Sequence, residues 1–159
     1  MIKHAKATDL DVIVSLATKT RENMLLNGLK QWTGNYPDRE SFERDLKKDG
    51  LYIYKDGENI IASISILPEN DEAYKEIEWL KYKSLVIHRV VVDPNKQKTG
   101  IGMELFDFAK QIGKQGNYES IKVDTHPDNY KMQGLIAKAG YKPIGYLSGI
   151  NRLAYELVL

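Results

Sequence analysis

The chain has 159 residues, enough for one domain with its own hydrophobic core. Its formal net charge of +1 argues against a nucleic-acid partner bound through a basic surface, and no apolar run approaches the roughly 20 residues of a membrane span. It has no cysteine, which excludes disulfides and thiolate metal sites. The N-terminal residues lack the apolar core of a signal peptide. We expect one cytoplasmic domain over residues 1–159, with neither nucleic acid nor membrane as partner.

The first half of the chain is predicted to form a short strand, two helices and a β-hairpin. Residues 2–7 favour a strand, and apolar spacing predicts a helix from Asp9 to a break at Asn27 and Gly28. A second helix is expected over residues 37–48, with Pro37 near its first turn. An Asp-Gly pair between the apolar runs 51–54 and 60–67 indicates a hairpin. The acidic stretch 68–76 is expected to be an exposed connection.

Two aromatic residues lie in the loop between the two predicted helices. Trp32 and Tyr36 stand in a segment that also contains glycine, asparagine and proline. Their rings can close one end of the core, or they can line a substrate pocket, because aromatic side chains join rigid surface with a polar group. Both interpretations stay open, and Trp32 and Tyr36 are therefore candidate substrate-binding residues.

The segment from residue 85 to residue 116 carries the strongest functional signal. A β-branched apolar run over residues 83–93 is typical of a buried strand, and Asp93 with Pro94 ends it. Apolar residues then recur at helical spacing, so a helix is expected to begin between Thr99 and Gly102. Unpaired amides at a helix start attract anions, and glycine lets a phosphate approach the backbone. The loop is either a phosphate site or a helix start that merely contains glycine.

The spacing of this loop excludes two familiar phosphate motifs. A P-loop requires lysine and then serine or threonine after its second glycine, whereas Gly102 is followed by Met103 and Glu104. A dinucleotide-binding fingerprint requires a third small residue where this chain has Leu105. A nucleotide-binding domain of either kind is therefore a poor interpretation.

The last part of the chain is predicted to alternate strands and helices. The helix after the glycine loop is expected to stop at Gly113 and Gly116, and a strand follows over residues 120–124. Asp128 or Asn129 caps a further helix that ends at Gly140, and strands are expected over residues 141–146 and 150–159. The element order predicts an α/β (α+β) fold, with helices on the faces of a mixed sheet.

Several residue groups together resemble the GCN5-related N-acetyltransferase (GNAT) superfamily. In family order they are Val90-Val91-Val92-Asp93-Pro94, Gln97-x-x-Gly100-x-Gly102, Val123-Asp124-Thr125, Asn129-x-x-Met132 and Ala139-Gly140-Tyr141. The resemblance covers essentially the whole chain and is most specific over residues 85–141. It implies a central mixed, mostly antiparallel sheet with splayed central strands, flanked by about four helices.

The resemblance also implies that acetyl-CoA is the co-substrate. The glycine loop would hold the pyrophosphate, and the valine strand would pair with the pantetheine arm. The cofactor-binding residues that the resemblance implies are Val90, Val91, Val92, Gln97, Lys98, Thr99, Gly100, Ile101, Gly102, Asn129 and Met132. No metal is expected, because the three histidines are isolated in the sequence and have no paired ligand spacing.

In this family a neutral amine attacks the thioester directly, which requires an oxyanion donor, a base and an acid. The resemblance implies the backbone N–H of Val90 as the oxyanion donor. His88 is a candidate base, since the reference pKa of histidine is about 6.5, and the alternative is a histidine satisfied within the sheet. Asp124 and His126 are further candidates, although turn and loop roles suit them too. Many relatives have a tyrosine as the acid where this chain has Ile136, so the acid is unassigned.

Two functions from different classes follow from these observations. The first is acetyl transfer from acetyl-CoA to a primary amine of a small molecule or peptide, by direct attack in a ternary complex. The alternative, motivated by Ile136, is a non-catalytic acyl-CoA-binding or sensing module with the same fold. Acidic residues between Glu69 and Glu78 favour a cationic acceptor. A homodimer joined through sheet edges is a further expectation.

Overall fold

The computed structural model describes residues 1–97 and 99–159 of the chain. Lys98, one of the predicted cofactor-binding residues, lies outside the described residues. The chain divides into two compact units: unit 1 is Met1–Leu67 with His88–Leu105, and unit 2 is Pro68–Ile87 with Phe106–Leu159. Strand β4 (Ser84–Val92) and helix α3 (Ile101–Gln115) contribute residues to both units. That residues 1–159 form a single functional domain stays a prediction.

The strands form one mixed sheet, in the order β1-β2-β3-β4-β5-β7-β6. Its β4–β5 pair is parallel, whereas β1–β2, β2–β3, β5–β7 and β6–β7 are antiparallel. In unit 1 the further elements are β1 (Ile2–His4), η1 (Ala7–Asp9), α1 (Leu10–Leu26), α2 (Arg39–Lys47), β2 (Leu51–Asp56), β3 (Asn59–Leu67) and η3 (Pro94–Lys96). In unit 2 they are η2 (Glu72–Glu76), β5 (Ser120–Thr125), α4 (Tyr130–Lys138), β6 (Lys142–Leu147) and β7 (Arg152–Val158). The predicted fold class, with four α-helices among the described residues, is confirmed.

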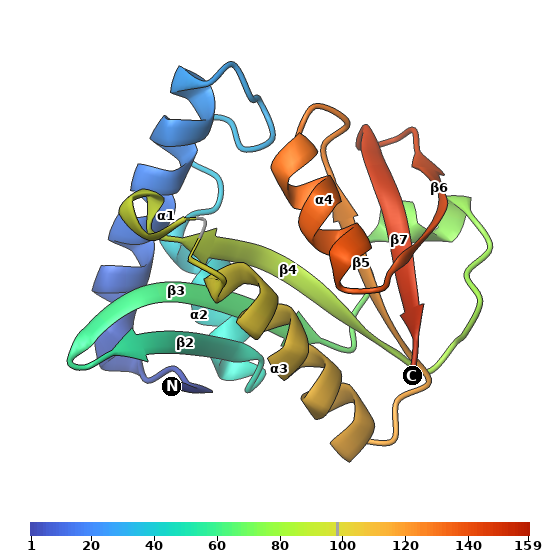
Figure 1. The fold of residues 1–159 in the computed structure, drawn as a ribbon, viewed down its shortest axis with the longest axis horizontal. Coiled ribbons are helices and arrows are strands. Elements are labelled where there is room, and N and C mark those ends of the chain that lie inside the picture. Colours follow the sequence, from blue (N-terminus) through green and yellow to red (C-terminus); the bar gives the residue numbers. More distant parts are fainter. Residues whose placement is uncertain (98) are drawn as a thin grey trace. The chain divides into compact units, whose positions relative to one another are not determined.

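The core of unit 1 lies between α1, α2 and the strands β2 and β3. Helix α1 buries Leu10, Ile13 and Leu16, whose spacing places them on one helical face, and Phe42 of α2 joins the same cluster. Figure 1 shows α1 beside β3, in agreement with the contacts between the two elements. The apolar periodicity therefore predicted this helix correctly.

Two predicted element ends in the sequence were placed wrongly. Helix α2 begins at Arg39, because the side chain of Asp38 accepts a hydrogen bond from the Ser41 amide (2.9 Å) and caps it, so Pro37 precedes the helix. Helix α3 continues through Gly113 and ends at Gln115, so the predicted stop at Gly116 is confirmed and the one at Gly113 is wrong. A Cβ atom at Gly113 would lie 2.7 Å from the Leu159 side chain, so this glycine provides close packing and does not stop the helix.

Unit 2 is built on the first half of β4 with β5, β7 and β6. The β4–β5 ladder has three residue pairs, from Ser84–Ser120 to Val86–Lys122, whereas β5 pairs with β7 over its whole length. The paired part of β4 and β5 is thus short, which is the feature that the predicted separation of the two strands requires. Figure 1 shows β6 beside β7, with η2 close to β6.

The prediction of an exposed connection over residues 68–76 holds for most of the stretch, and the exception is Tyr74. This stretch contains the turn η2, and Tyr74 is only 2% exposed. Tyr74 packs in a cluster with Val86, Leu147 and Ala154, and its ring lies 4.8 Å from that of Trp79. The acidic composition of the stretch hid one aromatic anchor, which holds the segment on the sheet of unit 2.

Within the described part of the chain, no helix combines the length and the apolar character needed to cross a membrane.

Candidate functional site

The second half of β4 contains a residue, Arg89, with a left-handed backbone conformation. Arg89 has a φ of +48°, and four consecutive buried residues, Ser84–Ile87, precede the half-buried His88. A left-handed residue within a strand changes the alternation of side chains, as in a β-bulge. The simple alternation that would place His88 and Val90 on one face is therefore interrupted between them.

The side chain of Arg89 is held by two residues of unit 1. Its Nε and Nη2 atoms donate to the two carboxylate oxygens of Asp45, each at 2.6 Å, and Nη1 donates to the Tyr36 hydroxyl at 3.1 Å. Burial lowers the pKa of Arg89, but the hydrogen bonds that Arg89 donates to Asp45 and Tyr36, together with the charge of Asp45, outweigh burial and leave that pKa above its ordinary value. The guanidinium is therefore a permanent charge. No local sequence signal indicates this pairing, since Asp45 and Arg89 are 44 positions apart.

The three valines after Arg89 differ in the surroundings of their side chains. Val91 is completely buried in the core of unit 1, and Val90 and Val92 are half-buried. A buried Val91 can serve a ligand only through its backbone. The predicted role of all three valines, pairing with the pantetheine arm, also uses the backbone alone. The packing of their side chains is consistent with that role.

The loop that follows β4 is organised by short side-chain contacts. The Asp93 carboxylate accepts a hydrogen bond from the Asn95 amide (3.0 Å) and starts the turn η3. The Thr99 hydroxyl donates to the carbonyl of Lys96 at 2.5 Å. Gln97 is half-buried, whereas Lys96 and Thr99 are exposed. These contacts lie within residues 93–99, and α3 begins two residues later, at Ile101.

The N-terminus of α3 has the geometry of an anion site. The Glu104 amide donates to the Gly100 carbonyl (3.1 Å), so the amides of Ile101, Gly102 and Met103 precede the first intrahelical hydrogen bond. Gly100 has a φ of +86°, and, apart from Gly100 and its chain neighbours, no atom of the described residues lies within 4 Å of the place that a Cβ atom would occupy. A phosphate can therefore approach bare backbone where the helix dipole is positive, so these residues fit a pyrophosphate group.

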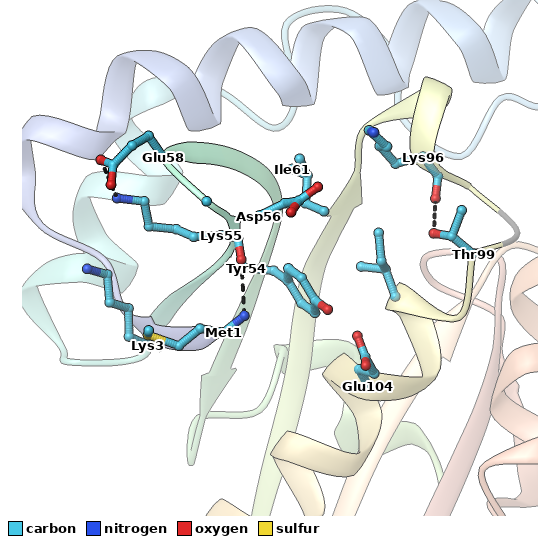
Figure 2. Close-up of a pocket in the computed structure, with 12 residues that line it drawn as sticks. Met1, Lys3, Tyr54, Lys55, Asp56, Glu58, Ile61, Lys96, Thr99 and Glu104 are labelled. Carbon is cyan, nitrogen blue, oxygen red and sulfur yellow. Dashed lines mark hydrogen bonds and ion pairs between the residues drawn. The ribbon is translucent and has the colours of Figure 1, made fainter.

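A pocket of about 730 Å³ lies beside this loop, within unit 1. Figure 2 shows the β2–β3 hairpin on one side of it, and Lys96, Thr99 and Glu104 on the other. Its lining residues are Met1, Lys3, Tyr54, Lys55, Asp56, Gly57, Glu58, Ile61, Lys96, Thr99, Ile101 and Glu104. Lysines and carboxylates are mixed in this lining, and Lys55 lies 3.9 Å from Glu58. The pocket therefore shows no preference for ligands of one charge.

In unit 2, Asn129 has the role of a helix cap. Its side-chain oxygen accepts a hydrogen bond from the Met132 amide (3.1 Å), which selects Asn129 over Asp128 as the cap of α4. Asn129 is 7% exposed and Met132 is half-buried. The contact of both residues with a cofactor stays a prediction.

None of three residues in or next to α4 that were considered as the proton donor for the leaving thiolate has a setting that assigns it this role. Ile136 is completely buried, so the position that is often tyrosine in relatives belongs to the core. Tyr130, at the first position of α4, is 75% exposed. Tyr141 is 4% exposed with its ring edge-on to Phe106, and its hydroxyl has no hydrogen-bond partner among the described residues.

The two candidate substrate-binding aromatics differ from each other. Trp32 is 6% exposed and belongs to the core of unit 1, whereas Tyr36 is 44% exposed. Their ring centroids lie 6.5 Å apart in an edge-to-face arrangement. Trp32 thus supports the loop, and Tyr36 is the member of the pair whose surface is available to a ligand.

Three of the acidic residues that favoured a cationic acceptor, Asp71, Glu72 and Glu76, have structural partners. Glu76 accepts hydrogen bonds from the Ser148 hydroxyl (2.8 Å) and from the amides of Ser148 (3.0 Å) and Gly149 (2.8 Å). The bond from the Ser148 hydroxyl is the main reason that the pKa of Glu76 lies below its usual value. Asp71 caps η2, and Glu72 pairs with Lys75 at 2.9 Å. The argument for a cationic acceptor is therefore weakened.

A tyrosine–carboxylate pair, which sequence reasoning did not connect, lies at the end of β5. The Tyr74 hydroxyl donates to Oδ2 of Asp124 at 2.5 Å, and Oδ1 of Asp124 lies 3.9 Å from Arg152 Nε. Burial, and next the charge of Asp124, raise the pKa of Tyr74 well above its ordinary value, so it remains a donor. The His126 Nδ1 atom accepts a hydrogen bond from the Asp128 amide (3.0 Å), which is a loop role. The sequence alone did not indicate that Tyr74 pairs with Asp124 or that His126 binds the Asp128 amide.

Among residues 1–97 and 99–159, no group of three histidine, cysteine, aspartate or glutamate side chains is placed to hold a metal ion.

Comparison with known proteins gives one family for this fold. Residues 15–141 match the family described as the acetyltransferase (GNAT) family. A GNAT-family acetyltransferase from Streptococcus agalactiae 2603 has a TM-score of 0.88 and 22% identity, with 100% of this chain and 95% of that chain covered. A presumed acetyltransferase from Staphylococcus aureus MU50 has 30% identity and a TM-score of 0.78, with coverages of 99% and 98%.

A third solved structure is a ribosomal-protein-alanine N-acetyltransferase from Brucella melitensis. It has a TM-score of 0.73 and 15% identity, and the match covers 100% of this chain and 99% of that chain. At this identity the likeness concerns the fold alone. No curated protein matches the chain by sequence.

Proposed function

Because the chain belongs to the acetyltransferase (GNAT) family, we propose that it transfers an acetyl group from acetyl-CoA to a primary amine of a small molecule or peptide. Both substrates are bound at once, and the amine attacks the thioester directly. The observation that carries the proposal is the start of α3, where three amides follow the left-handed and uncrowded Gly100. In this family that place serves the pyrophosphate of acetyl-CoA.

The residues of the chain have separate roles in this proposal. The amides of residues 101–103 hold the pyrophosphate, and Lys96 adds a positive charge beside them. Bound acetyl-CoA supplies an electrophilic thioester carbonyl. The backbone from Val90 to Val92 aligns the pantetheine arm, and the Val90 N–H donates to the carbonyl oxygen as negative charge develops on it. Asn129 and Met132 contact the arm.

Two proton transfers accompany the attack. The amine must lose a proton, and His88, half-buried in the second half of β4, is the proposed base. The leaving thiolate must gain a proton, and we assign no side chain to this step, because Ile136 is completely buried and carries no proton. Solvent protonation of the thiolate is sufficient for turnover, since a thiolate is a weak base.

The acceptor is proposed only as a class. A neighbour of the same fold is named for the acetylation of a protein's alanine, which is consistent with an amino group as acceptor. The alternative function, a non-catalytic acyl-CoA-binding module, is favoured by one observation, the buried Ile136 in place of an acid. Both functions need the same cofactor loop and differ only in turnover.

The first experiment measures acetyl-CoA binding by calorimetry for the wild type, Gly100→Asp and Gly28→Asp. Gly28 is a matched control, because it also has positive φ (+75°) and open space around its Cβ position but lies at the end of α1. Gly100→Asp adds both backbone strain and a repelling carboxylate at the phosphate site, so its affinity should fall about tenfold or more. Gly28→Asp, which has the same strain, should bind acetyl-CoA as the wild type does.

A second experiment follows thiol release with a panel of amines and amino-terminal peptides. Turnover with any acceptor supports the acetyltransferase. Binding without turnover over the whole panel supports the non-catalytic module. A wild-type protein that binds no acyl-CoA contradicts both functions.

A further inference from the structure

We propose that Arg89 is a positioning residue, which joins the left-handed turn of β4 to α2 and to the loop of residues 29–37. It fixes, with one guanidinium, both the direction of the Val90 N–H and the position of the Tyr36 ring. The inference rests on the proposed function, because Val90 is the proposed oxyanion donor. All of the residues concerned belong to unit 1.

The backbone of Arg89 provides the first step of the argument. A left-handed φ strains a residue that has a Cβ atom, whereas glycine adopts it without that strain. The chain nevertheless has an arginine at a φ of +48°. The contacts of its side chain must therefore offset the strain. They link the left-handed backbone at Arg89 to Asp45 and Tyr36.

The contact with Asp45 fixes the guanidinium in orientation as well as in place. Two parallel hydrogen bonds of 2.6 Å join it to both carboxylate oxygens, and this bidentate geometry defines the plane of the group. The side chains of Arg89 and Asp45 are 14% and 3% exposed, so water and salt screen the pair little. The Ser65 hydroxyl of β3 donates to Asp45 as well (2.5 Å). The guanidinium is thus anchored to α2 and β3.

The contact with Tyr36 extends this anchor to the loop. The third nitrogen of Arg89 donates to the Tyr36 hydroxyl, and the Tyr36 carbonyl accepts a hydrogen bond from Arg21 of α1 (3.4 Å). The Tyr36 ring contacts the buried Trp32 at its edge and is otherwise 44% exposed. The hydroxyl, the ring edge and the backbone carbonyl of Tyr36 are thus each held by a contact. An exposed ring that is already fixed offers a substrate surface that loses little entropy on binding.

One guanidinium therefore serves two steps of the proposed reaction. The turn at Arg89 sets the direction of the next N–H in the strand, that of Val90, and an oxyanion donor is effective only when it is aimed before the reaction. Tyr36 is held as a wall for the acceptor. Loss of the Arg89 contacts should lower kcat through Val90 and raise the KM of the acceptor through Tyr36. The phosphate loop around Gly100 should bind acetyl-CoA as before.

Three variants separate these roles. Arg89→Gly/Asp45→Asn retains the turn without strain, removes the guanidinium and leaves no unpaired buried charge. Arg89→Lys keeps the charge but cannot form two parallel bonds. Tyr36→Phe removes only the hydroxyl that Arg89 binds. Arg39→Gln is the matched control, because it breaks an exposed ion pair of α2 with Asp11 and Glu43.

Each variant is measured by amide hydrogen exchange at residues 89–91 without substrates, by acetyl-CoA calorimetry, and by kcat and KM with an acceptor from the panel. The double variant should exchange about tenfold faster at residues 89–91. Its kcat should fall about 100-fold, while acetyl-CoA affinity stays within about threefold. Arg89→Lys should show the same changes to a smaller extent. Tyr36→Phe should raise the acceptor KM about fivefold without faster exchange, and Arg39→Gln should match the wild type.

The inference is overturned if the double variant, or Arg89→Lys where the double variant does not fold, keeps wild-type exchange and wild-type kcat. It is also overturned if kcat falls only in proportion to the fraction of folded protein, which indicates a merely structural contact. A different result separates the two proposals. If the double variant exchanges faster at residues 89–91 but the wild-type protein acetylates no acceptor, the proposed function is contradicted and the role of Arg89 in β4 stands.

Discussion

The two units neutralise a buried carboxylate in different ways. In unit 1, Asp45 gives both oxygens to the guanidinium of Arg89. In unit 2, Glu156 is 1% exposed and accepts hydrogen bonds from the amides of Leu80 (2.7 Å) and Lys81 (3.2 Å) and from the Ser120 hydroxyl (2.5 Å). The first carboxylate therefore holds a side chain next to the proposed chemistry. The second holds a backbone segment on the sheet.

This difference teaches that the function of a buried charge follows from its partner. Lys122 lies opposite Glu156 in the β5–β7 ladder, yet its ammonium is placed 4.9 Å from the Trp79 ring centroid. Glu156, Lys122 and Trp79 together secure residues 74–81, which carry Tyr74. Replacing Glu156 should therefore affect stability before activity, and replacing Asp45 should do the reverse.

The largest effect is expected for Glu156→Ala. The variant leaves two backbone amides and a buried lysine without their carboxylate, so the free energy of unfolding should fall by about 3 kcal/mol. Burial already lowers the pKa of Lys122, which Glu156 raises, so the variant should lower that pKa further. Urea unfolding of the whole chain measures the loss.

A suitable control is Glu119→Ala, because Glu119 is exposed and accepts a hydrogen bond from the Lys83 amide (3.2 Å). It should change stability by about 0.5 kcal/mol or less. Equal effects of the two variants would contradict the importance given to burial.

The next effect is expected for Asp45→Asn. It weakens charged hydrogen bonds with Arg89, so unfolding should become easier by about 2 kcal/mol. The loss of kcat at a temperature where the variant is fully folded should exceed that of any unit 2 variant of equal stability. Paired unfolding and steady-state measurements test the comparison directly, and a strict proportion between stability and kcat across both units would break it.

A smaller effect, with the opposite sign, is expected for Tyr141→Phe. The Tyr141 hydroxyl is buried without a partner among the described residues, and the ring contact with Phe106 survives the change. Removal of an unsatisfied polar group should leave stability unchanged or raise it by up to about 1 kcal/mol. Thermal unfolding measures this, and turnover should stay at the wild-type level. A loss of turnover would assign this hydroxyl to the reaction, as the missing acid.

The smallest effect is expected for Glu76→Gln and depends on pH. The pKa of Glu76 in the folded protein lies below its ordinary value of 4.5, so its hydrogen bonds from Ser148 and Gly149 stabilise the fold above pH 4.5. This contribution is lost as the pH falls through the lowered pKa. Wild type and variant should differ in thermal stability at pH 7 and converge in acid. A difference that grows below pH 4 would show the wrong sign.

Features that depend on neighbouring residues were predictable from the sequence. The glycine loop, the hairpin at Asp56 and Gly57, and the Asn129 cap all depend on residues within a few positions of one another. The helix spacing of α1 was visible for the same reason. Apolar spacing likewise located the start of α3 between Thr99 and Gly102 without any knowledge of tertiary contacts.

Features that depend on distant partners were not predictable. Glu76 meets Ser148 over 72 positions, and Tyr74 meets Asp124 over 50. Gly113 packs against Leu159, which is remote in the sequence, so its role in close packing could not be predicted from its neighbours. The side chain of Arg89 reaches a partner on α2 that no periodicity links to β4. Residue type alone shows that a charge is present and does not show what it binds.

The position of β7 has a consequence for folding during synthesis. β7 follows every other strand in the chain, yet it pairs with β5 on one side and β6 on the other. Unit 2 therefore cannot complete its sheet until residue 158 has left the ribosome, whereas the residues of unit 1 are all available once Leu105 has emerged. The proposed cofactor loop would thus be folded while the strands of unit 2 still await their central member, and slow synthesis of residues 152–158 should expose those strands to aggregation.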